Sequence, residues 1–117
     1  MMRILITVCT LFVALSAPLA AEKVEGYLMD KAWSARVAKE GVDAAKTHTK
    51  DCALMPNCKD SGYGVVTADG KFLKFDKDGD RVAARMLGFA SGKDNIKATV
   101  NGEVKGSSIV VTAIQLN

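Results

Sequence analysis

The stretch Ile96-Lys97-Ala98-Thr99-Val100-Asn101-Gly102-Glu103-Val104-Lys105 carries the clearest structural signal in the chain. Small or apolar residues alternate in it with polar ones, which is the period of a β-strand that buries one face. Gly106 and Ser107 follow as a turn, and Ser108–Leu116 returns as a second strand. Because this last strand is apolar on both faces, we expect it to lie centrally in a sheet or to carry a bulge.

Three further strands are predicted upstream of this hairpin. Val65–Thr67 and Lys71–Phe75 flank Ala68-Asp69-Gly70, and an Asp-Gly pair suits the positive φ angles of a tight turn. Val24–Asp30 alternates less regularly, which indicates a first strand with both faces partly covered.

Two segments have the period of a helix instead. Ser34–Thr47 is rich in alanine, lysine and glutamate, and Ser34 can cap its first turn. Asp80–Ala90 places its apolar residues on one stripe and ends at Ser91-Gly92.

The order of these elements predicts the fold class. One strand, a helix, two strands, a second helix and two final strands follow the order of an OB-type barrel. We therefore expect a mainly β fold, an OB-like β-barrel of five strands with two helices. One helix is inserted between strands 1 and 2, and the other between strands 3 and 4. Closing the sheet would hide the edges of short apolar strands from aggregation.

Residues 1–21 are expected to be a cleavable signal peptide. Arg3 supplies a positive charge, Ile4–Leu15 is apolar, and small residues allow cleavage after Ala20 or Ala21. The apolar run is shorter than the roughly 20 residues that cross a bilayer as a helix. Residues 22–117 would then form a single domain in the periplasm or outside the cell, with no membrane span.

The charge balance of the mature chain is close to neutral. Removing Arg3 with the leader leaves 15 of the 16 basic residues against 13 acidic ones, an excess of two. So small and evenly spread an excess does not favour a nucleic-acid partner.

His48–Cys58 gathers the residues that could carry chemistry. It holds the only histidine and, with Cys9 discarded in the leader, both remaining cysteines. In an oxidising compartment, the main expectation is a disulfide between Cys52 and Cys58.

Two other chemistries stay open for the same segment. His48, Cys52, Met55 and Cys58 are donors of the kind that copper(I) prefers, and the imidazole and thiolates also suit zinc. If the preceding helix continued through the segment, His48 and Cys52 would stand one turn apart on one face. Thiol redox catalysis is a third possibility, although the spacing is not Cys-x-x-Cys.

The remaining residues show no catalytic motif, so we do not expect an enzyme. An alternative is a ligand-stacking face made of aromatic and basic residues. Its candidates are Tyr27, Trp33, Tyr63, Phe72, Phe75, Lys71 and Lys74.

Several runs together resemble a known family. They are Gly26–Asp30, His48-Thr49-Lys50, Cys52–Met55 with Cys58, Ser61–Gly64, Asp69–Phe72, Lys74–Asp76, Val100–Gly102 and the Ile109, Val111, Ile114 pattern. The chain is similar in these runs to small exported bacterial proteins with an OB-like fold and no established activity. Those relatives carry a further cysteine shortly after the first strand, where this chain has Trp33. A site built from three cysteines and a histidine would therefore lack one ligand here.

These observations together predict an exported, non-enzymatic, OB-like binding or interaction module. It would be a monomer without a cofactor, stapled by the Cys52–Cys58 disulfide. Its partner would be an envelope protein, a peptide or a glycan. The alternative is a periplasmic copper- or zinc-binding protein using His48, Cys52, Met55 and Cys58.

Overall fold

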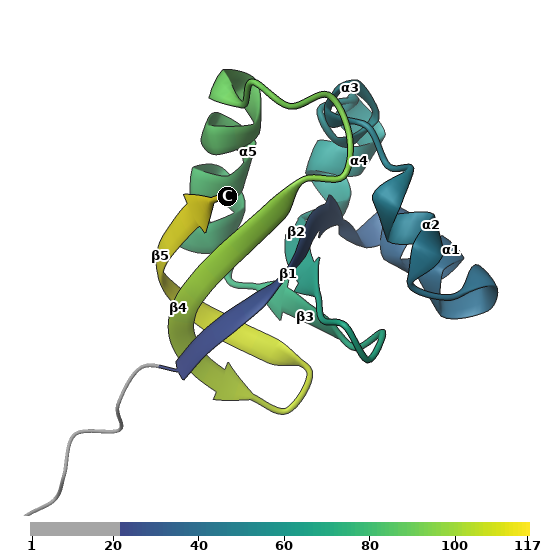
Figure 1. The fold of residues 1–117 in the computed structure, drawn as a ribbon. Coiled ribbons are helices and arrows are strands. Elements are labelled where there is room, and N and C mark those ends of the chain that lie inside the picture. The colour runs from purple at the N-terminus through teal and green to yellow at the C-terminus, as the bar shows by residue number, and fades with distance from the viewer. Residues whose placement is uncertain (1–21) are drawn as a thin grey trace, which may run out of the picture.

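The computed structural model describes residues 22–117, and Figure 1 shows their fold. The expected signal peptide, residues 1–21, lies outside the described residues. Five strands make one sheet, in the order β1-β2-β3-β5-β4, and β4 pairs again with β1, so the sheet closes on itself. The strands are β1 (Glu22–Asp30), β2 (Tyr63–Val66), β3 (Phe72–Phe75), β4 (Lys97–Lys105) and β5 (Ser108–Leu116).

β1 is long enough to serve both neighbours. Its first part pairs with β4 and its last part with β2, both antiparallel. Tyr27 takes part in both pairings, and a Cβ on the preceding Gly26 would lie 2.2 Å from the Val66 carbonyl oxygen. Glycine therefore permits the close approach that closure requires. β3 and β5 run parallel, so the sheet is mixed.

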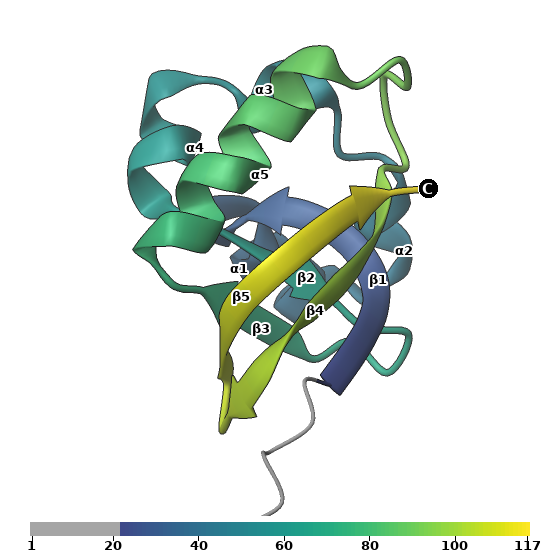
Figure 2. The ribbon, with the colours of Figure 1, turned by 90° about the vertical axis from the view of Figure 1, so that its left-hand side faces the viewer.

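Four helices occupy the connection between β1 and β2, residues 31–62, which we call the crossover. A fifth helix follows β3. They are α1 (Lys31–Glu40), α2 (Asp43–Lys46), α3 (Lys50–Ala53), α4 (Pro56–Ser61) and α5 (Lys77–Phe89). Helices α1 to α4 lie together beside β1 and β2, whereas α5 lies next to β5 (Figures 1 and 2).

The predicted fold class is wrong. We expected a mainly β, OB-like barrel with two helices, but residues 22–117 contain five helices and a mixed five-stranded sheet, which makes the fold a mixture of α and β. The single helix expected over Ser34–Thr47 is broken because Gly41 ends α1 at a φ of 95°. Thr49 is extended before α3 and Pro56 starts α4, so the crossover continues as short helices.

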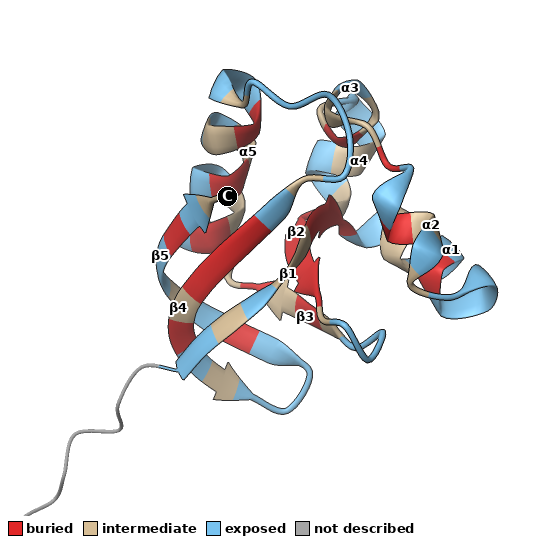
Figure 3. Ribbon diagram, in the orientation of Figure 1, coloured by how far each residue is buried: buried red, intermediate tan, exposed pale blue. Residues whose placement is uncertain are grey.

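The buried residues form two clusters. The larger cluster lies inside the closed sheet and is covered by α5, through Ala83 and Leu87. The smaller cluster joins Met29 and Val66 of the sheet to Val37 of α1 and Ala45 of α2. Figure 3 shows the buried positions along β1, β2 and β4 and on the inner side of α5. Within residues 22–117, no helix combines the length and the apolar character needed to cross a membrane.

Candidate functional site

His48 is buried and paired with Asp30. Its side chain is 3% exposed and that of Asp30 is fully buried, and Nε2 of His48 lies 2.6 Å from Oδ1 of Asp30. Asp30 is the last residue of β1, and its other oxygen accepts a 2.9 Å hydrogen bond from the backbone N–H of Trp33. One carboxylate thus caps α1 and holds the crossover histidine against the end of β1.

The environment favours the ionised form of Asp30. Burial by itself raises the pKa of this carboxyl, but the hydrogen bonds from His48 and Trp33 and the charge of His48 outweigh burial. The pKa of Asp30 is therefore below its ordinary value.

Trp33 covers the histidine. The two rings are stacked with centroids 4.5 Å apart, and the indole N–H donates to the Ala44 carbonyl. Arg36 lies over the outer face of the indole, 4.8 Å from its centroid. Trp33 is therefore a lid over the Asp30–His48 pair, and it is not part of a surface for stacking a ligand.

The two cysteines within residues 22–117, Cys52 and Cys58, are free thiols, so the expected disulfide between them is not formed in this structure. Cys52 belongs to α3 and Cys58 to α4, and the turn at Leu54–Met55 separates the two short helices. The pKa of the Cys58 thiol is raised by burial, and further by the carboxylate of Asp30 and by Cys52. A raised pKa keeps this sulfur protonated at neutral pH, which works against thiol redox catalysis.

The expected metal ligands are not brought together. No three histidine, cysteine, aspartate or glutamate side chains among residues 22–117 are grouped so that they could hold a metal ion. His48 precedes α3 and turns toward Asp30, so it is not one helical turn from Cys52 on a shared face. Met55, the expected thioether ligand, is 53% exposed. The four donors of the alternative hypothesis are thus not arranged as one metal site among residues 22–117.

The residues after His48 hold the loop 90–96, which joins α5 to β4. Thr49 pairs with Asp94 as an isolated β-bridge, and the Lys50 backbone N–H donates to the Lys93 carbonyl. The Lys50 ammonium donates a 2.8 Å hydrogen bond to the Ala90 carbonyl. We call these contacts the Thr49–Lys50 clamp.

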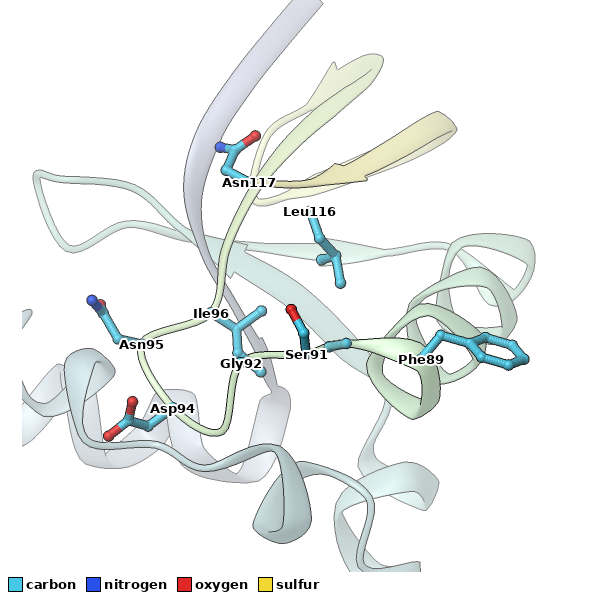
Figure 4. A pocket seen from close by; sticks show the side chains of 9 residues that line it. Phe89, Ser91, Gly92, Asp94, Asn95, Ile96, Leu116 and Asn117 are labelled. Atoms are coloured by element: carbon cyan, nitrogen blue, oxygen red, sulfur yellow. The ribbon is translucent and has the colours of Figure 1, made fainter.

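The clamped loop forms one wall of a hollow of about 320 Å³ (Figure 4). Ile96 and Leu116 supply apolar side chains facing its interior, and Ser91 points toward Leu116 from the opposite wall. The side chains of Asp94, Asn95 and Phe89 point away from Ile96, Ser91 and Leu116 in Figure 4. Its lining is Phe89, Ala90, Ser91, Gly92, Asp94, Asn95, Ile96, Leu116 and Asn117.

A second hollow, of about 210 Å³, shares the lining residue Asn117 with the first. Its lining is Glu25, Gly26, Tyr27, Ala68, Lys97 and Asn117. Here the Lys97 ammonium lies over the Tyr27 ring, 5.8 Å from the centroid. We call the two hollows together the Asn117 groove.

Of the aromatic face expected from the sequence, Tyr27 alone reaches this groove. Tyr63 and Phe75 are buried in the larger core cluster. The Tyr63 hydroxyl donates to the Ala53 carbonyl, and burial, followed by the charge of Asp30, raises its pKa to about 12. These rings are therefore core, and they are not available for stacking.

No known protein or structure similar to this chain was found. Comparisons with protein-family models, with curated proteins and with solved structures find no match to this chain.

Proposed function

We propose that residues 22–117 are an exported, non-enzymatic binding module of the bacterial envelope, and that the Asn117 groove is its ligand site. The observation that carries this proposal is that two neighbouring hollows share Asn117 in their linings. The larger one, at about 320 Å³, has the size of a small-molecule site.

The position of the reactive residues supports a binding role. His48, Cys52 and Cys58 do not line the groove. His48 is committed to Asp30, and the Cys58 thiol is held protonated. The crossover residues thus support the fold and the groove wall, and they perform no turnover.

Export is supported by the sequence of residues 1–21 and by the resemblance of the His48–Cys58 run to small exported bacterial proteins. N-terminal sequencing of protein isolated from the envelope fraction tests this part. A mature chain beginning at Ala21 or Glu22 is the expected result, whereas a retained Met1 in a cytoplasmic fraction contradicts it.

Binding is tested by pelleting the mature chain with purified peptidoglycan sacculi, the insoluble envelope polymer. Gly92→Phe places a ring in the groove wall, where the nearest atom to an added Cβ is the Asp94 carbonyl oxygen at 3.9 Å. Gly88→Phe is the matched control, because it lies in open space on α5 and outside the groove. We expect wild type and Gly88→Phe to pellet and Gly92→Phe to stay in solution. Equal pelleting of both variants, or no pelleting of wild type, contradicts the proposal.

A further inference from the structure

Two backbone carbonyls that border the Asn117 groove already accept hydrogen bonds from within the sheet. The Ile96 carbonyl accepts from the Leu28 N–H, and the Lys97 carbonyl accepts from the Asn117 N–H, each at 2.9 Å. Leu116 pairs with Ala98 of β4, whereas β5 pairs with β3 only at Ser108 and Ile109. A peptide lying along Ile96 and Lys97 would therefore find these two carbonyls occupied, and would lose there the main-chain pairing that commonly gives such complexes their affinity.

The charges of the groove do not favour an anionic polymer. Its lining contains the carboxylates of Glu25 and Asp94 and the single ammonium of Lys97. That ammonium is also held over the Tyr27 ring. A phosphate- or uronate-rich chain would meet more negative than positive charge along this path.

The larger hollow combines a small apolar interior with one hydroxyl. Ile96 and Leu116 face the interior and Ser91 faces Leu116, as Figure 4 shows. A methyl group next to an amide fits this arrangement, because the methyl is buried against the two aliphatic chains while the amide reaches the hydroxyl. The polar lining residues Asp94 and Asn95 can bond ring hydroxyls.

We infer that the ligand of the Asn117 groove is a neutral glycan with N-acetyl groups, whose acetamide enters the hollow between Ile96, Leu116 and Ser91. This inference rests on the proposed function and adds the ligand class to it. A neighbouring sugar then lies in the second hollow, beside Tyr27 and Lys97.

Nuclear magnetic resonance titration of the ¹⁵N-labelled mature chain tests the inference with three probes. Chitotetraose carries the acetamide, cellotetraose has the same linkage without it, and tetra-alanine represents a peptide. We expect chitotetraose to shift the amides of Ser91, Ile96 and Leu116, and cellotetraose to bind at least about tenfold more weakly, the loss of one buried group. Gly92→Phe should abolish the shifts, and Gly88→Phe should retain them.

The outcomes separate the two claims. If tetra-alanine shifts the groove amides and chitotetraose does not, the glycan inference is wrong while the binding site stands. Equal affinity for chitotetraose and cellotetraose also overturns the inference, because the acetamide then contributes nothing. If no probe shifts these amides and sacculi fail to pellet the protein, both the inference and the proposed function fail.

Discussion

Nε2 of His48 lies 2.6 Å from Oδ1 of Asp30, and both side chains are shut away from solvent. This pair connects the end of β1 to the crossover that leads to α3, and it does so across 18 positions of sequence. We expected the Cys52–Cys58 disulfide to fix the crossover. In the structure a buried, charge-assisted hydrogen bond under the Trp33 ring does so instead.

Asp30→Asn is expected to destabilise the fold by about 3 kcal/mol, because it leaves His48 buried without its charged partner. Urea unfolding followed by circular dichroism measures the change in the free energy of unfolding. Asp43→Asn is the matched control, since Asp43 pairs with Lys46 on an exposed helix face and should change stability by less than about 1 kcal/mol. If the two substitutions lower the free energy of unfolding equally, the Asp30–His48 pair does not hold the crossover to β1.

Asp30 also makes stability depend on pH. Its pKa in the folded protein is below the ordinary value of 3.8, so its stabilisation is fully present above pH 3.8. The stabilisation is lost as the pH falls through the folded pKa. Unfolding curves for wild type and Asp30→Asn should therefore differ most near neutral pH and converge in acid. A difference that stays constant from pH 7 to pH 2 contradicts this assignment.

The sequence predicted the strands better than the connections. The hairpin of β4 and β5 follows directly from the alternation in Ile96–Lys105, and β4 and β5 are indeed paired. The crossover could not be predicted as one helix because its breaks depend on Gly41 and on the extended Thr49. Reading a single helical period across those breaks produced the wrong number of helices.

The sequence predicted only some of the residues of the candidate site. The sequence singled out His48 as a possible metal ligand, but its partner Asp30 was missed. An aspartate immediately before a helical segment is a cap signal, and this could have identified Asp30. The Asn117 groove had no such signal, because it joins Glu25, Ala68, Lys97 and Asn117 through strand pairing, far from one another in sequence.

Removing both thiols should leave the fold nearly intact, since neither is bonded to the other. We expect the double variant Cys52→Ala, Cys58→Ala to unfold within about 1.5 kcal/mol of wild type, far closer than Asp30→Asn. Urea unfolding of all three proteins under one set of conditions makes the comparison. If the double variant loses as much unfolding free energy as Asp30→Asn, a Cys52–Cys58 disulfide fixes the crossover after all.

The raised pKa of Cys58 should also appear in its reactivity. Alkylation by iodoacetamide proceeds through the thiolate, so its rate at Cys58 should rise at higher pH than that of a free cysteine peptide. Peptide mass spectrometry after timed quenching gives the rate at this residue. Failure to react at any pH until a reductant is added would instead reveal a Cys52–Cys58 bridge.

Lys50 links the crossover to the groove, and its removal should loosen the groove before it loosens the fold. Lys50→Met keeps the aliphatic chain but loses the 2.8 Å hydrogen bond to the Ala90 carbonyl. We expect faster amide hydrogen exchange over residues 90–96 and weaker chitotetraose binding, with a loss of global stability of only about 1 kcal/mol. Lys46→Met is the control, because Lys46 is an exposed lysine whose partner is Asp43, outside the groove. If both variants exchange like wild type in this loop, the Thr49–Lys50 clamp does not hold the groove wall, and the crossover and the ligand site are independent parts of the molecule.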